Sequence, residues 1–182
     1  MAKCEDYFLR NLQETDLEKV LTWRNSERVR INMYTNHVIT WEEHLAWFQK
    51  IQKKENVIYL IFEFLSCPIG LICFTDLDRT NNKALGGFYL GEVDTSPRSG
   101  IAMEYLGLEY VFEKMDFRKL GCEVLAFNKS VIKFHKKFGF SQEGYFNQHI
   151  YRDGQYLDVV FLALLKEDWL NSKERLAKLA FR

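Results

Sequence analysis

Two short segments of the chain combine residue types that could bind and protonate a substrate. In the first, residues 97–102 with the sequence PRSGIA, Gly100 lets an anion approach the backbone and Arg98 can pair with phosphate oxygens. The segment lies between an expected strand and an expected helix, where free backbone N–H groups and the helix dipole attract anions. It predicts a phosphate-binding loop, but an ordinary strand-to-helix connection with a solvated arginine explains the segment alone equally well.

The second segment, residues 128–140, has the sequence NKSVIKFHKKFGF and is typical of a strand end followed by a short helix. Gly139 lacks a Cβ and can adopt the left-handed conformation that ends a helix, with Phe140 placed to fold back on it. His135 has an ordinary pKa of ~6.5, so it can exchange protons near neutral pH. The segment therefore offers an acid–base group, and a histidine that only packs is the alternative.

Periodicity, capping boxes and turn signals locate the elements that must position these segments. Thr15 with Glu18, and Thr40 with Glu43, have the spacing of capping boxes at the start of helices. Asp153-Gly154 is a strong hairpin turn signal. The expected strands cover residues 7–12, 57–64, 69–76, 84–91, 119–127, 148–152 and 156–165. The expected helices cover residues 15–26, 41–51, 100–115, 130–138 and the C-terminal segment.

This order of elements predicts an α/β protein whose mixed sheet has about seven strands, with helices on both faces. One βαβ unit joins the strand near Tyr89 to the strand near Val124, so these two strands should run parallel. No repeat, low-complexity stretch or Pro/Gly-rich linker interrupts the chain. Residues 1–182 are therefore expected to form a single domain.

The composition of the chain indicates which kinds of partner it is not expected to bind. The 25 basic and 25 acidic residues balance, which argues against a protein that binds nucleic acid or membranes through bulk charge. The longest apolar run, residues 159–165, is too short to span a bilayer and no secretory segment is evident, so a cytoplasmic location is expected. The four cysteines show no C-x-x-C spacing, and we expect neither a metal site nor disulfides.

The 128–140 segment, the Gly100 loop and the order of elements together resemble the GNAT superfamily of acetyl-CoA-dependent N-acetyltransferases, over nearly the whole chain. The resemblance implies a splayed parallel strand pair that holds the pantetheine near residues 88–91 and 125–128. It also implies that loop amides hold the pyrophosphate. The implied acetyl-CoA-binding residues are Tyr89, Leu90, Gly91, Arg98, Ser99, Gly100, Ile101, Ala102, Asn128, Phe134 and Lys137.

Two positions depart from the family pattern. Pro97 stands where the family's loop usually begins with Gln or Arg, and Arg98 could supply the charge instead. His135 stands where the family has a tyrosine that protonates the departing coenzyme thiolate. An imidazole N–H can also donate to a thiol whose ordinary pKa is ~8.5. Glu92, followed by Asp94, is the candidate general base, but a solvated carboxylate is the alternative. A backbone N–H near Leu90 would stabilise the oxyanion.

Further matches are closest to the acetyltransferases of the pseudaminic acid pathway: residues 23–25 (WRN), 41–48 (WEEHLAWF) and 156–159 (YLDV). That resemblance implies acetylation of the 4-amino group of UDP-4-amino-4,6-dideoxy-N-acetyl-β-L-altrosamine, a precursor of the sugar on flagellin. Arg24 and His44 would be cationic donors to the diphosphate, and the aromatic residues, Trp47 among them, would stack or pack. The implied acceptor-binding residues are Arg24, Asn25, Met33, Tyr34, Trp41, His44 and Thr75.

Two other functions stay open at this point. Ribosomal-protein N-terminal acetyltransferases share the arginine-asparagine helix and the late Asp-Val strand, and they would take a peptide amine. A coenzyme-binding module without catalysis is the other alternative, which the presence of His135 disfavours. The first two expected helices carry no clear excess of acid, which favours an anionic sugar nucleotide over a peptide amine. Whether the last helix pairs with a second subunit to form a homodimer is open.

Overall fold

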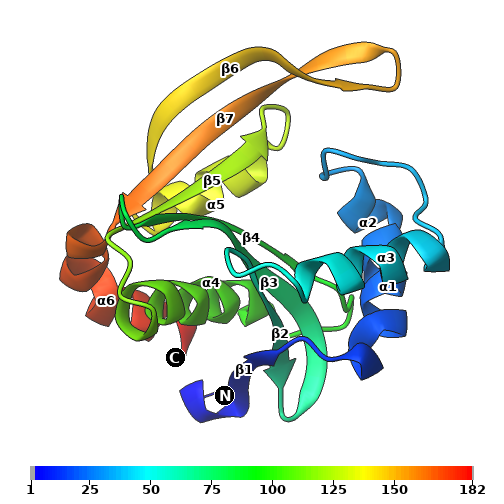
Figure 1. Ribbon diagram of the computed structural model, residues 1–182. Coiled ribbons are helices and arrows are strands. Elements are labelled where there is room, and N and C mark those ends of the chain that lie inside the picture. The colour runs from blue at the N-terminus through cyan, green and yellow to red at the C-terminus, as the bar shows by residue number, and fades with distance from the viewer. Residues whose placement is uncertain (1–2, 182) are drawn as a thin grey trace.

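The structure, a computed structural model, describes residues 3–181 and contains a seven-stranded mixed sheet in the order β1-β2-β3-β4-β5-β7-β6 (Figure 1). Every neighbouring pair is antiparallel except β4 and β5. The strands are β1 Tyr7–Asn11, β2 Ile58–Phe64, β3 Cys67–Asp78, β4 Lys83–Leu90, β5 Lys119–Leu125, β6 Ser141–Arg152 and β7 Gln155–Leu165. The predicted fold class is therefore confirmed.

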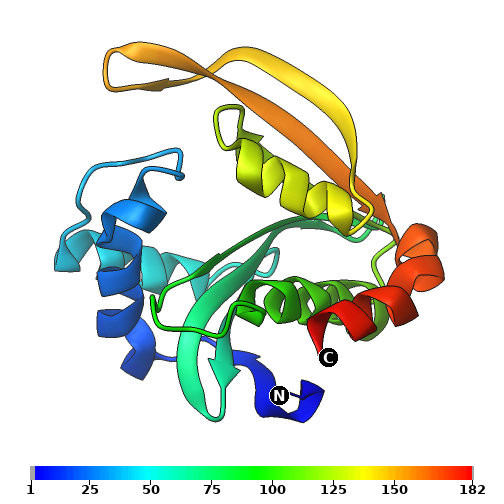
Figure 2. The ribbon, with the colours of Figure 1, turned by 180° about the vertical axis from the view of Figure 1, so that it is seen from behind.

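Helices cover both faces of this sheet (Figures 1 and 2). Side chains of a strand alternate between its two faces. Leu60 and Phe62 of β2 accordingly belong to the core under α4, α5 and α6, whereas Ile61 packs with α1 and α3 on the other face. The helices are α1 Leu17–Asn25, α2 Glu27–Arg30, α3 Trp41–Ile51, α4 Ser99–Glu109, α5 Lys129–Lys137 and α6 Lys166–Ala180. None of the helices in the described range is long and apolar enough to cross a membrane.

The parallel pair is short and then divides. Lys83, Ala84 and Leu85 of β4 pair with residues 119–121 of β5, and the pairing of these two strands stops there. Beyond this point β4 continues along β3, whereas β5 continues along β7. The parallel direction is as predicted, but Tyr89 and Val124 are not paired neighbours because both lie beyond the point where the strands separate.

One predicted capping box is confirmed and the other is wrong. The Thr40 hydroxyl accepts a hydrogen bond from the Glu43 amide at 3.2 Å, and the Glu43 carboxylate accepts one from the Thr40 amide at 2.8 Å. Thr15 instead lies inside a 3₁₀ turn, Glu14–Asp16, and does not cap α1, which begins at Leu17. Asp16 fixes this turn, because its carboxylate accepts from the Gln13 amide at 2.9 Å and binds the Arg10 guanidinium.

Two other elements differ from the prediction. A short extra helix, Glu27–Arg30, follows α1. Strand β6 begins at Ser141 rather than at residue 148, because Gly139, with φ of +100°, ends α5 and the chain pairs with β7 two residues later. The sequence did not indicate this part of β6 because it is an edge strand with mostly exposed, polar side chains. The hairpin turn at Asp153-Gly154 is confirmed.

Candidate active site

The separation of β4 and β5 opens a cleft of about 840 Å³. Residues from α4 and α5, which cover one face of the sheet, line it together with residues from α1, α2 and α3 on the other face. The cleft therefore reaches through the sheet at the place where the pairing of β4 with β5 stops. Its volume is that of a site for a small organic ligand, typically ~300–1,000 Å³.

The start of α4 presents free backbone donors to this cleft. The amides of Ser99 and Ala102 are used, since they donate to Ser96 and Arg98 carbonyls at 2.8 and 2.9 Å. The amides of Gly100 and Ile101 have no acceptor among the described residues, as expected for the first turn of a helix. Gly100 itself lines the cleft.

A side chain at Gly100 would occupy cleft space rather than collide with the protein. An added Cβ would meet only Leu90, with Cδ1 at 3.8 Å, so the missing side chain leaves room for a ligand at this point. Arg98 is the exposed residue that precedes the helix, whereas the Ser99 side chain is fully buried with its hydroxyl 3.5 Å from that of Tyr7. The buried Ser99 side chain therefore supports the start of the helix from the core side.

Helix α5 forms the neighbouring wall of the cleft through Asn128 and Phe134. The Asn128 carboxamide oxygen caps the helix by accepting from the Val131 amide at 3.3 Å, and its nitrogen donates to Asn32 at 2.9 Å. Lys137 is exposed in the last turn of α5 and does not line the cleft. On β4, Tyr89 and Leu90 line the cleft, whereas Gly91 packs against the Trp23 ring.

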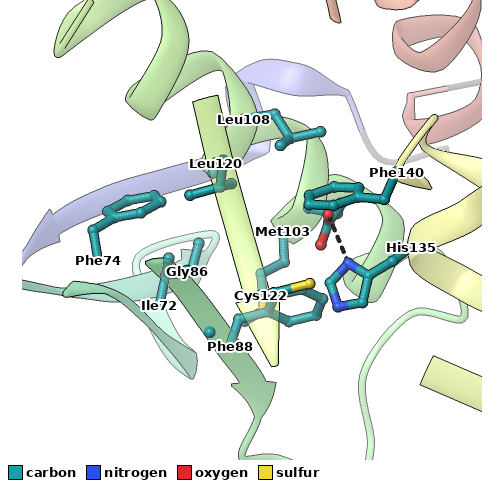
Figure 3. Close-up of a pocket in the computed structure, with 13 residues that line it drawn as sticks. Ile72, Phe74, Gly86, Phe88, Met103, Leu108, Leu120, Cys122, His135 and Phe140 are labelled. Atoms are coloured by element: carbon teal, nitrogen blue, oxygen red, sulfur yellow. Dashed lines mark hydrogen bonds and ion pairs between the residues drawn. The ribbon is translucent and has the colours of Figure 1, made fainter. Parts of the chain in front are cut away.

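His135 lines the cleft from α5 and is 6% exposed. Its Nδ1 lies 3.2 Å from Oε1 of the buried Glu104 on α4 (Figure 3). Burial opposes protonation of this imidazole, but the Glu104 carboxylate and the Cys122 side chain outweigh it and raise the pKa of His135 to about 10. His135 is therefore an imidazolium at neutral pH, with Nδ1 held by Glu104 and the Cys122 side chain as a further partner of the ring.

Arg24 and His44 meet in the same cleft from α1 and α3. Arg24 donates through Nη2 to the Thr35 carbonyl at 2.7 Å, while its Nη1 is buried without a partner in the described range. His44 is 4% exposed, and its Nε2 also lacks a hydrogen-bond partner in the described range. Burial lowers the pKa of His44, and this effect exceeds the opposite effect of a hydrogen bond with the Leu17 backbone. His44 is thus neutral at neutral pH, which corrects the expectation of a second cation.

The other predicted acceptor residues do not line the cleft, apart from Met33. Asn25 exchanges two hydrogen bonds of 2.8 Å with the Ile39 backbone, so it shapes the connection between α2 and α3. Trp41 is 41% exposed, and Thr75 lies at a register shift of β3. Tyr34 donates at 2.6 Å to Glu123 of β5 and thereby ties the connection to the sheet.

Glu92, the predicted general base, lies outside the cleft. Its carboxylate accepts from Lys19 at 3.0 Å and from the Trp23 indole at 3.1 Å, and these two contacts lower its pKa. A carboxylate held in this way is a weak base and is committed to other donors.

Residues 31–39 form a segment that lines the cleft and hydrogen-bonds to elements on its other side; we call it the crossing segment. The contacts that pin it are Asn128 to Asn32, Tyr34 to Glu123, Asn36 to Asp153, and Arg152 to the carbonyls of Ile31 and Met33. They join the layer of α1–α3 to α5, β5 and the β6–β7 hairpin, the parts of the molecule that the divided strands would otherwise leave apart.

Two buried or cleft-lining carboxylates were not identified from the sequence. Glu123 lines the cleft from β5, and its neighbours in sequence gave no signal for it. Glu104 could have been noticed, because it is the one charge among residues 99–108 of an otherwise apolar helix. Its partner His135 lies 31 residues away, a pairing that no local pattern reports.

A mixed sheet that divides at its one parallel pair, with free helix-start amides beside the division, can hold an elongated ligand that carries a phosphate group. The family model described as an acetyltransferase (GNAT) domain matches residues 9–161, and the chain belongs to this family. It is therefore an acetyl-CoA-dependent N-acetyltransferase, as the sequence predicted.

Individual relatives agree at the level of the family. The chain is 25% identical over 168 residues to the SPbeta prophage-derived uncharacterized N-acetyltransferase YokL of Bacillus subtilis, covering 91% of this chain and 93% of the relative. It is 25% identical over 104 residues, 57% of each chain, to B. subtilis YdaF, whose name proposes a ribosomal N-acetyltransferase. Spermidine N-acetyltransferase from Vibrio cholerae, solved with CoA and spermine, shares the fold at a TM-score of 0.85 and 18% identity, with 92% and 99% coverage.

The described residues fit acetyl-CoA. When bound, it supplies an acetyl group activated as a thioester and a thiolate as leaving group. The Gly100 and Ile101 amides are placed to donate to phosphate oxygens, and the free edges of β4 and β5 can offer hydrogen bonds to a chain lying between them. None of these relatives supports the pseudaminic acid pathway in particular.

Proposed function

We propose that the protein acetylates a small amine that also carries an oxygen-rich, anionic group, with the UDP-4-amino sugar predicted from the sequence as the first acceptor to test. The observation that carries this proposal is the unpartnered Nη1 of Arg24, buried in the wall of the cleft. The proposal takes residues 1–182 as one cytoplasmic domain acting on a small molecule.

An unpaired guanidinium N–H in a buried place costs free energy, typically ~1–3 kcal/mol and more for charged groups. Burial lowers the pKa of Arg24, but the ordinary pKa of a guanidinium is so high that the side chain is still charged at neutral pH. An anionic oxygen of the acceptor would satisfy Nη1 and offset the cost of its burial. The neutral His44 beside it presents a nitrogen without a partner, which suits a hydroxyl or amide of the same molecule.

The same wall disfavours a polyamine acceptor. Spermine, bound in the Vibrio cholerae structure, offers ammonium groups and hydrocarbon, and neither can accept a hydrogen bond from Arg24. Two carboxylates line the cleft, but both already have hydrogen-bond partners. Glu43 contacts the Thr40 amide and His37. Glu123 accepts a hydrogen bond from Tyr34, so neither carboxylate is left free for an ammonium group. A peptide amine of a ribosomal protein is the second candidate, because YdaF carries that name and a peptide carbonyl could also accept from Arg24.

In this proposal His135 is the general acid of the reaction. The amine attacks the thioester as a neutral base, the C–N bond forms, and the C–S bond breaks. His135 gives its Nε2 proton to the departing sulfur, and the proton of the amine leaves to solvent. Glu92 takes no part in this reaction, because Lys19 and Trp23 occupy its carboxylate outside the cleft.

The acceptor class can be decided by measuring thiol release from acetyl-CoA with four amines in parallel. These are UDP-4-amino-4,6-dideoxy-N-acetyl-β-L-altrosamine, the same amino sugar without UDP, a peptide with a free N-terminal serine, and spermidine. We expect the highest kcat/KM for the nucleotide-linked sugar, and a lower value when UDP is removed. A preference for spermidine, or equal rates with and without UDP, would overturn the proposal.

A further inference from the structure

Glu104 is a buried charge without an evident structural purpose. It is 4% exposed and lies in the middle of α4, between Met103 and Tyr105, which belong to the core. Removing a carboxylate from water costs several kcal/mol, and an apolar side chain of similar volume would often be as stable or more so. The structure therefore buries a carboxylate, at a cost in free energy, at a position where an apolar side chain would pack.

The carboxylate of Glu104 pairs with His135. This carboxylate lies 3.2 Å from Nδ1 of His135, and the two side chains are 3% and 7% exposed. The His135 ring is enclosed by Phe140 at 4.9 Å and Phe88 at 5.6 Å between ring centroids. The cavity beside the pair is about 20 Å³, little more than one water molecule needs, so bulk water does not screen the interaction (Figure 3).

Few other polar groups face His135. Glu104 approaches from α4 and Cys122 from β5, whereas β4 contributes Phe88 and the end of α5 contributes apolar rings. Among the described charged residues lining this cavity, Glu104 is thus the one that can hold a proton on the imidazole. It can also fix the ring, since a carboxylate that accepts from Nδ1 restricts how the imidazole turns.

We infer that Glu104 is a positioning residue that keeps His135 protonated and oriented with its Nε2–H toward the reacting thioester. The inference deepens the proposed function and rests on its assignment of His135 as the acid. Glu104 does not touch the substrates. After His135 has given its Nε2 proton to the departing sulfur, the neutral ring keeps Nδ1–H donated to Glu104 and regains the Nε2 proton from solvent.

The experiment compares Glu104→Gln with Glu109→Gln, a change of the same type on α4 at a partly exposed carboxylate paired with Lys173. The protonation of His135 is followed directly by NMR of its imidazole in the protein alone. We expect Glu104→Gln to lower the pKa of His135 well below about 10, because burial is then opposed by the Cys122 side chain alone. Glu109→Gln should leave the titration unchanged.

The rate is then measured across pH with any accepted amine. We expect kcat of Glu104→Gln to fall about 10²-fold at pH 8 and to recover toward pH 6, with KM for acetyl-CoA unchanged. In a His135→Tyr background, Glu104→Gln should lower kcat much less, because a phenol needs no neighbouring carboxylate to stay protonated. A purely structural Glu104 would instead lower activity at every pH and in both backgrounds.

The outcomes separate this inference from the proposed function. An unchanged His135 titration in Glu104→Gln overturns the role of Glu104, whatever the acceptor is. A shifted titration with an unshifted pH–rate profile overturns His135 as the acid, and with it the catalytic part of the inference. A change of preferred acceptor among the four amines affects the proposed function alone. Melting of both variants near the parent temperature shows that each is folded.

Discussion

At the scale of single residues, the site depends on two histidines whose surroundings push their protonation in opposite directions. His135 faces a buried carboxylate and is charged, whereas His44 is buried without one and is neutral. Sequence alone gives both the same ordinary pKa. The difference arises from packing partners, because burial disfavours the charged form and an adjacent anion restores it.

His135 should tolerate tyrosine better than phenylalanine. We expect His135→Ala to lower kcat by ~10²–10⁴-fold with little change in coenzyme binding, the range typical of a lost general acid. His135→Tyr should recover part of the loss, since a phenol can donate to the same sulfur, whereas His135→Phe should not. Steady-state kinetics with saturating acetyl-CoA measures this series. Equal and nearly full activity of the Phe and Tyr variants would show that His135 only packs.

Arg24 should serve the acceptor and not the coenzyme. Arg24→Ala removes a charged hydrogen-bond donor worth about 1.5–3 kcal/mol, so the acceptor KM should rise about tenfold to a hundredfold. The KM for acetyl-CoA should stay within error. Thr35→Val is the control, because it removes one contact of Arg24, to the Thr35 hydroxyl at 2.9 Å, while leaving the guanidinium in place. If both KM values rise together in Arg24→Ala, the residue is structural.

At the scale of elements, the start of α4 combines two functions. Its buried side chains, Ser99 and Ala102 among them, fix the helix against the core, and its free amides at Gly100 and Ile101 face outward. The position of this helix follows from its apolar spacing, so the sequence could predict where the amides would lie. Arg98, the charge of the same loop, lies exposed just before the helix.

Gly100 and Gly91 should respond differently to a side chain. Gly100→Val should weaken coenzyme binding about tenfold or more without unfolding the domain, because the new side chain enters the cleft and meets only Leu90. Gly91→Ala should instead destabilise the protein, since its Cβ would fall 2.0 Å from the Trp23 ring. Calorimetric titration with CoA and thermal melting separate the two effects. Equal CoA affinity of Gly100→Val and parent would remove the loop from the site.

The sequence predicts elements better than the contacts between them. The Thr40 capping box was correct because its partners are three residues apart, whereas Thr15 failed because Asp16 is fixed by Arg10 of a neighbouring strand. The same distinction governs the site. Gly100 and Asn128 were found from local motifs, but Glu104 acts through a residue 31 positions away and could be assigned only in three dimensions.

At the scale of the whole molecule, the fold separates two strands and then reconnects the halves through the crossing segment. The divided strands leave unpaired backbone edges that a bound thioester chain can use, and the segment's hydrogen bonds to α5, β5 and the β6–β7 hairpin hold the cleft in place. Activity and stability are coupled if His135 acts as proposed, because this residue is also buried.

That coupling makes the stability of the molecule depend on pH in a defined way. The pKa of His135 is raised from 6.5 to about 10 on folding, so the folded state binds this proton more tightly than the unfolded chain. The resulting stabilisation is fully present below pH 6.5 and is lost as pH rises through about 10.

The experiment that tests this pH dependence uses a Glu104→Met/His135→Phe variant as its reference. This variant replaces the ion pair by apolar side chains of similar volume, which have no group to titrate at these two positions. Subtracting its free energy of unfolding from that of the parent, measured with denaturant at several pH values, should give a difference that is flat below pH 6.5. Above that pH it should fall by about 1.4 kcal/mol per unit toward pH 10, the slope of one proton. A difference that stays constant across this range would mean that His135 is not held protonated in the folded state.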